Sequence, residues 1–83
     1  MLFETEGIMD FPDALNACLG GSRITNENWN GKGMYIEVIP GCRNMFNEMM
    51  LPFLEMTNAN GEKVPWLISQ MDVFSTGWKI IEG

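Results

Sequence analysis

The residues best suited to chemistry are a lysine between two glycines and the aromatic side chains that accompany it. Lys32 lies in the segment Trp29-Asn30-Gly31-Lys32-Gly33. A lysine flanked by glycines lets an ammonium group and a backbone N–H approach the same phosphate oxygen. Aromatic rings offer faces on which a nucleobase can stack. The candidates for stacking are Trp29, Tyr35, Trp66 and Trp78.

These residues leave two interpretations open. The Gly-Lys-Gly turn lacks the full G-x-x-x-x-G-K-[ST] spacing of a nucleotide-triphosphate loop, so it is also typical of an ordinary turn before a strand. Each tryptophan equally suits the core or a protein interface. The residues alone therefore indicate a small-molecule site only as one of two alternatives.

The charge balance excludes several classes of partner. The chain carries 11 acidic and 5 basic residues, a net charge of −6. A binder of DNA or RNA needs a basic surface to displace counterions, and an anionic membrane surface would repel this chain. A small anionic ligand stays open, because one lysine in a pocket acts at short range.

The composition argues against an enzyme. There is no histidine, which removes the commonest general base and the commonest metal ligand. Cys18 and Cys42 have no metal-ligand spacing, and Cys18 falls on the apolar face of a predicted helix, where a cysteine is typically a small core residue. The acids are scattered singly along the chain. We therefore expect no catalytic residue, no metal and no cofactor.

The length and hydropathy predict a single domain over residues 1–83 that associates with itself. The chain has 83 residues, of which 46 % are hydrophobic, including three Trp, five Phe and eight Met. A chain this small buries a limited share of its surface, and the excess apolar surface favours a partner.

The start, MLFETEGIMDF, carries acids where a secretory signal needs positive charge, and no apolar run approaches a membrane span. We expect a cytoplasmic protein.

The elements that would position these residues are short. Asp10, Pro12 and Asp13 predict a helix start, and Gly20-Gly21 predict its end. The helix face is predicted to consist of Phe11, Leu15, Cys18 and Leu19. Strands are predicted at 22–25, 34–40, 51–57, 64–67 and 78–81, with a hairpin turn at 58–63 and a second short helix at 69–77. Residues 42–50 show no period and are expected to form a loop or one helical turn.

The fold class is therefore α+β: an antiparallel sheet of four or five strands with one or two short helices. Trp78 is expected in the core. Residues 1–8 could be a frayed end or an additional edge strand. Ser69 and Asp72 stand in an S-x-x-D relation, which is typical of a helix cap.

Four segments, in order and spacing, resemble the Thoeris anti-defence two family of small phage proteins. They are FPDALNACLGG, WNGKGMY, LPFLEM and NGEKVPWLISQMDVFSTGWKI, which together cover about residues 9–81. The resemblance implies a non-enzymatic sponge that sequesters glycocyclic ADP-ribose, the nucleotide signal of bacterial TIR-domain immunity, in the cytoplasm of the infected host. It also implies a homotetramer that holds the ligand between protomers, and in some relatives a second site for cyclic dinucleotides.

The resemblance also implies roles for individual residues. Trp29 would be a stacking platform, and Lys32 would face a phosphate. Asn30 and the turn Gly31–Gly33 would supply polar and backbone contacts. Pro65 and Trp66 would form an aromatic wall. Ser69, Gln70 and Asp72 would meet ribose hydroxyls or the adenine edge, with helix capping as the alternative for the Ser69–Asp72 pair.

The chain departs from the family pattern at two places. Relatives carry basic residues just before the first tryptophan, where this chain reads ITNEN, and an acidic residue where this chain has Gly77. The first departure weakens the case for a strongly cationic pocket. Arg43 is the candidate for a second anionic ligand. The alternatives are a protein that blocks a host defence factor directly, against which the dispersed acids argue, and a nucleotide hydrolase or cyclase.

Overall fold

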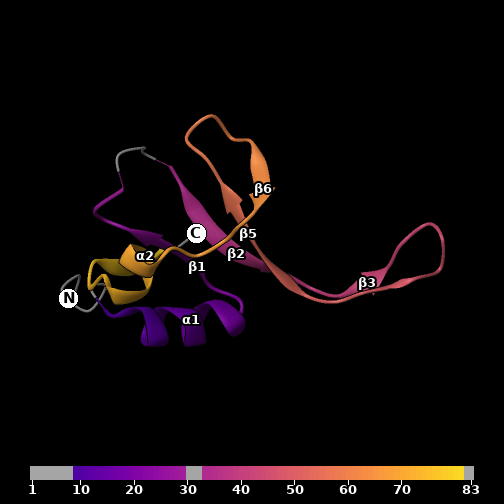
Figure 1. Ribbon diagram of the computed structural model, residues 1–83, viewed down its shortest axis with the longest axis horizontal. Coiled ribbons are helices and arrows are strands. Elements are labelled where there is room, and N and C mark those ends of the chain that lie inside the picture. The colour runs from indigo at the N-terminus through magenta and orange to yellow at the C-terminus, as the bar shows by residue number, and fades with distance from the viewer. Residues whose placement is uncertain (1–8, 30–32, 82–83) are drawn as a thin grey trace.

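One antiparallel sheet with a helix packed on one of its faces makes up most of the fold (Figure 1). The structure is a computed structural model that describes residues 9–29 and 33–81. The helices are α1 (Phe11–Leu19) and α2 (Gln70–Phe74). The strands are β1 (Arg23–Asn26), β2 (Tyr35–Ile39), β3 (Cys42–Arg43), β4 (Met49–Met50), β5 (Phe53–Thr57), β6 (Lys63–Pro65) and β7 (Trp78–Ile81). The main sheet has the order β6-β5-β2-β1-β7, and β3 and β4 form a separate hairpin.

The core lies between α1 and the inner face of the sheet. Ile24 of β1 and Ile36 of β2 are register partners, and both are fully buried. Ala14 and Cys18, one turn apart on α1, are also fully buried, as is Trp78 of β7. Because Ala14 and Cys18 are small, the helix backbone can approach the sheet closely. Burial raises the pKa of the Cys18 thiol, as suits a core residue and not a nucleophile.

Helix α1 begins as predicted, but its buried face differs at the C-terminal end. Asp10 is the N-cap, and its carboxylate accepts a hydrogen bond from the backbone N–H of Asp13 at 3.1 Å. The prediction that Leu19 belongs to the buried face is wrong, since this residue is 62 % exposed. The face is centred on Ala14 and Cys18 instead, which leaves Leu19 at the rim where the helix ends.

The predicted α+β class is confirmed, and so is the β5–β6 hairpin with its Asn58–Glu62 turn. The expectation for residues 42–50 is wrong. Instead of a loop or a helical turn, β3 and β4 pair through Cys42↔Met50 and Arg43↔Met49 and extend away from the sheet (Figure 1). We call residues 42–51 the arm. The sequence of the arm shows no alternation of apolar and polar residues, because neither of its faces is buried.

The outer face of the sheet, opposite α1, carries a charged cluster around Tyr35. Lys63 Nζ donates to Thr57 Oγ1 at 2.7 Å and to the Tyr35 hydroxyl at 3.2 Å. Arg23 Nε lies 3.3 Å from Glu37 Oε1, and its guanidinium lies 4.7 Å from the centre of the Tyr35 ring. Hydrogen bonds from Thr57 and then from Lys63 lower the pKa of Tyr35. The bond to Tyr35 in turn raises the pKa of Lys63.

No helix in the described ranges is long and apolar enough to span a membrane.

Two isoleucines of β2 allow a test of where the core lies. Replacing fully buried Ile36 by Ala leaves a cavity and is expected to cost about 2–4 kcal/mol of unfolding free energy. Ile39→Ala, at a half-buried position on the outer face, is expected to cost less than about 1.5 kcal/mol. Urea unfolding at one protein concentration measures both. Equal losses would contradict this placement of the core.

The charged cluster can be tested by titration, because Tyr35 is the single tyrosine of the chain. Lys63→Met removes a hydrogen bond that favours the phenolate, so the pKa of Tyr35 should rise. Lys79→Met, on β7, is the control and should leave this pKa unchanged. Absorbance of the phenolate against pH measures the shift. An unchanged pKa in Lys63→Met would refute the cluster.

Candidate functional site

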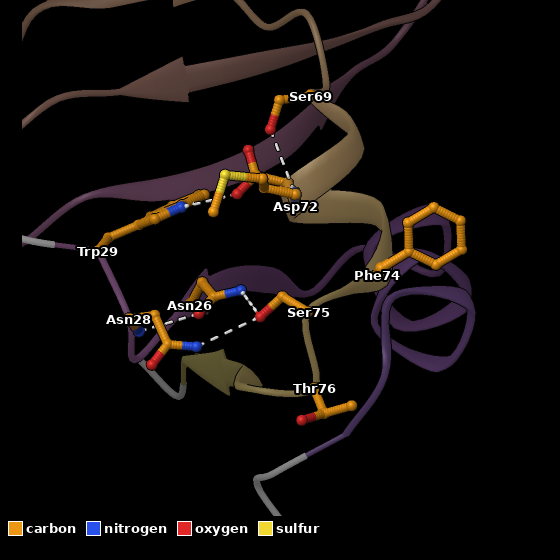
Figure 2. Close-up of a pocket in the computed structure, with 9 residues that line it drawn as sticks. Asn26, Asn28, Trp29, Ser69, Asp72, Phe74, Ser75 and Thr76 are labelled. Carbon is orange, nitrogen blue, oxygen red and sulfur yellow. Dashed lines mark hydrogen bonds between the residues drawn. The ribbon is translucent and has the colours of Figure 1, made fainter.

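A cleft of about 600 Å³ opens between the turn that follows β1 and the segment that runs from α2 to β7 (Figure 2). Its described lining residues are Asn26, Asn28, Trp29, Ser69, Met71, Asp72, Phe74, Ser75 and Thr76. Its volume is that of a site for a ligand of nucleotide size. The lining residues come from two distant parts of the chain, so the cleft exists only in the folded protein.

An aromatic cluster packs on the core side of the cleft. The Trp78 ring lies 5.3 Å from Trp29, 6.0 Å from Trp66 and 5.4 Å from Phe11, measured between ring centres. The three tryptophans meet edge to face, an arrangement that aromatic pairs prefer. Trp29 is therefore held on its core side by other rings while it also lines the cleft. A ring fixed in this way is a ready platform for a ligand.

Asp72 joins the cluster to α2 and presents its carboxylate at the cleft. Trp29 Nε1 donates to Asp72 Oδ1 at 3.2 Å, as Figure 2 shows. Trp78 Nε1 donates to the backbone carbonyl of Asp72 at 2.9 Å. Ser69 caps α2 by accepting a hydrogen bond from the N–H of Asp72 at 3.1 Å. Three contacts thus position one acidic group, which can accept hydrogen bonds from ligand hydroxyls.

A polar network around Ser75 forms the opposite wall. Asn26 and Asn28 donate from their side-chain amides to Ser75 Oγ, at 2.8 Å and 3.3 Å (Figure 2). The backbone N–H of Gly77 donates to the same oxygen at 3.2 Å. Ser75 Oγ has two acceptor lone pairs, which these N–H groups occupy, so its own proton is left to donate. The wall therefore offers a hydroxyl donor opposite the Asp72 acceptor.

The close fit of this wall explains Gly77. A Cβ at position 77 would lie 2.8 Å from Asn28 Nδ2 and 3.0 Å from Asn26 Oδ1. Real Cβ atoms do not approach other atoms so closely, and Asn26 is buried and has little room to move. The glycine is thus matched to the two asparagines.

The structure brings together some of the predicted site residues and separates others. Trp29, Ser69 and Asp72 all line the cleft. The capping interpretation of the Ser69–Asp72 pair is confirmed, and both residues still face the cleft. Trp78 is a core residue, as expected. The predicted residues Asn30, Gly31 and Lys32 lie outside the described residues.

The remaining predicted residues do not line the cleft. Pro65 is exposed in the edge strand β6, and Trp66 packs in the aromatic cluster behind Trp29. Gln70 is exposed on α2. Arg43 lies in β3 on the arm, where its guanidinium donates to the carbonyl of Asn47 at 2.8 Å. Strand β3 and helix α2 lie at opposite ends of the molecule (Figure 1).

Sequence reasoning missed six lining residues. They are Asn26, Asn28, Met71, Phe74, Ser75 and Thr76. The signal for the two asparagines was their place within three residues before Trp29. The signal for Ser75 was the polar step Ser-Thr-Gly before Trp78. Neither signal shows by itself that the two segments meet.

The chemistry of the described lining is that of a binding site. It contains one carboxylate, two amides, three hydroxyls and three large apolar side chains, with no lysine or arginine among the described residues. Such a surface suits hydroxyl groups and a ring system. It gives no counter-charge for a diphosphate, so a cation would have to come from outside the described lining.

Comparison with known proteins supports one assignment. A comparison with curated proteins gave no significant match. A family model described as the Thoeris anti-defense 2-like domain matches residues 9–81, which includes both walls of the cleft and the arm. The match covers nearly the whole chain and begins and ends where the motifs indicated. The chain therefore belongs to the Thoeris anti-defense 2-like family.

Proposed function

We propose that this protein is a sponge that binds glycocyclic ADP-ribose and withholds it from the bacterial effector without cleaving it. Membership of a Thoeris anti-defence family gives the biological setting. The observation that carries the proposal is the cleft, in which Trp29 and Asp72 are held rigidly by contacts behind them. Such preorganisation strengthens binding, because little side-chain freedom is lost when the ligand arrives.

The cleft is proposed to take the nucleoside part of the signal. Trp29 would pack against a ring of the ligand, Asp72 would accept hydrogen bonds from ribose hydroxyls, and Ser75 would donate to a ligand oxygen. This division follows from the described lining, which has acceptors, donors and apolar surface but no cation. Ser69 would help by fixing Asp72 through the helix cap.

The diphosphate needs a counter-charge, and Lys32 is the proposed source. Lys32 follows Trp29 by three residues in the sequence. A second protomer is proposed to complete the site, since the chain has only 5 basic residues and a shared site doubles those available to one ligand. We propose a single domain that assembles as a homotetramer and acts in the cytoplasm of the infected host.

The ligand platform is tested by Trp29→Ala. Loss of one stacked ring contact should raise the Kd for glycocyclic ADP-ribose roughly 10- to 100-fold, which corresponds to about 1–3 kcal/mol. Leu67→Ala is the control, because Leu67 is 91 % exposed and does not line the cleft. Isothermal titration calorimetry measures both. The wild-type complex, when heat-denatured, should release intact ligand.

Two outcomes would count against the sponge. Recovery of a hydrolysed product would indicate an enzyme. Absence of small-molecule binding in a protein that still blocks Thoeris defence would favour direct inhibition of a host factor. Lys32→Ala in the same titration tests the proposed counter-charge, and its effect should shrink as salt is raised.

The polar wall is tested by Gly77→Ala. The added methyl group must displace Asn26 and Asn28, so we expect ligand affinity to fall about tenfold and the free energy of unfolding to fall by about 1–3 kcal/mol. Gly20→Ala is the matched control, because a Cβ there meets its nearest atom at an ordinary 3.5 Å. Calorimetry and urea unfolding measure the two effects. Wild-type affinity in Gly77→Ala would show that the asparagines do not touch the ligand.

A further inference from the structure

We infer that the arm is the surface through which two copies of this chain associate. Each arm lies against the foot of its partner's arm, which is the place around Gly41 and Pro52 where the arm joins β2 and β5. The inference deepens the proposed self-association and rests on that part of the proposed function. It assigns the contact to named residues, and it does not depend on which ligand fills the cleft. The partner of the arm is a second copy of this chain.

The first observation is that the apolar side chains of the arm face solvent. Met45 is 88 % exposed and Phe46 is 73 % exposed at its tip. Further exposed apolar side chains follow along the arm and at its foot: Met49, Met50, Leu51 and Phe53. Exposed apolar side chains gathered in one short segment favour an interaction site there. Two strands of two residues each are also marginal in water without a covering partner.

The second observation is that the arm is a built structure. Asn44 Oδ1 accepts hydrogen bonds from the N–H groups of Phe46 and Glu48, at 2.9 Å and 3.0 Å. Its amide donates to Glu48 Oε1 at 2.9 Å. At the foot, a Cβ on Gly41 would lie 2.5 Å from the Met50 carbonyl, so the two legs meet where only glycine fits. The polar groups satisfy one another, and the apolar groups are left outward.

The third observation is an internal comparison with the β5–β6 turn. Asn58 Oδ1 accepts from the N–H groups of Asn60 and Glu62, both at 2.9 Å, and its amide donates to Glu62 Oε1 at 3.0 Å. The two turns, Asn44–Glu48 and Asn58–Glu62, thus share one hydrogen-bond pattern. Their second and third residues differ: Met-Phe in the arm and Ala-Asn in the other turn. The hydrogen bonds of the turn therefore do not require Met45 and Phe46. These two side chains are free to contact a partner.

The fourth observation is a receptor of matching chemistry at the foot of the arm. A groove of about 170 Å³ is lined by Leu19, Val38, Pro52, Phe53 and Leu54, all of them apolar. The exposure of Leu19 at the end of α1 helps to form it. In an isologous dimer the same patch serves both copies, so Phe46 of each copy can enter the groove of the other.

Charge favours a second copy at this place. The whole chain has a net charge of −6, so most faces of two copies repel each other. The arm contains one basic residue, Arg43, and one acidic residue, Glu48, and 1 − 1 gives a net charge of zero. The exposed apolar side chains of the arm and its foot add area to such a contact, and each partner of a standard interface gives roughly 800 Å².

The test transplants the tip of one turn onto the other. Met45→Ala with Phe46→Asn gives the arm the tip of the Asn58–Glu62 turn, which the chain already folds. Two apolar anchors are lost, so we expect the dissociation constant for self-association to rise roughly 10- to 100-fold in sedimentation velocity over a concentration series. The control, Val64→Ala with Leu67→Ala, removes side chains that are 47 % and 91 % exposed, outside both the arm and the cleft lining. It should associate like the wild type.

A crosslink tests which surface the arm meets. Phe46→Cys and Leu19→Cys are made separately, each with Cys42→Ser, then mixed and oxidised. A mixed disulfide between the two chains is expected, and its yield should exceed that of Phe46→Cys mixed with Ala59→Cys. Equal yields would overturn the groove as the receptor. A wild type that stays monomeric, or a tip variant that associates normally, would overturn the arm as the interface.

Ligand titration of the same tip variant separates this inference from the sponge. If the arm is the interface and the sponge proposal fails, association is lost while neither protein binds the nucleotide. If the sponge is right and the arm is not the interface, the variant binds nucleotide and associates like the wild type.

Discussion

The core and the cleft both depend on the packing and the hydrogen bond of the buried Trp78 indole. Its backbone pairs with Met9 on one side and lies in register with Asn26 on the other. Its N–H group donates to the carbonyl of Asp72, and its ring touches Phe11, Trp29 and Trp66. Helix α2 has only five residues and cannot hold its place alone. One side chain thus both fills the core and fixes the position of Asp72 at the cleft.

Most of the fold could be predicted from local signals. The cap at Asp10, the alternation in β2 and the Asn-Gly step of the β5–β6 turn each act within a few residues, so each can be recognised in the sequence. Leu19 could not be placed in this way. Helical spacing gives the apolar face, but the small volumes of Ala14 and Cys18 decide where that face is centred.

For the candidate site, single residues could be predicted, but the contacts between them could not. Trp29 and Asp72 stand out as residue types, yet the bond between them joins positions 43 residues apart. Asn26 and Ser75 are 49 residues apart, and neither is distinctive until the fold brings them together. The arm escaped prediction for another reason. Alternation arises when one face of a hairpin is buried within its own chain, and the arm buries neither.

The two Asn-to-Glu turns have a consequence for which substitutions this chain can accept. Each turn is locked by its first and last residues and by a fourth residue that accepts positive φ, Asn47 or Gly61. The second and third residues take no side-chain part in the lock. Two codons in each hairpin can therefore change freely while the backbone stays as it is. The side chains that each hairpin end presents can thus change separately from the backbone that carries them.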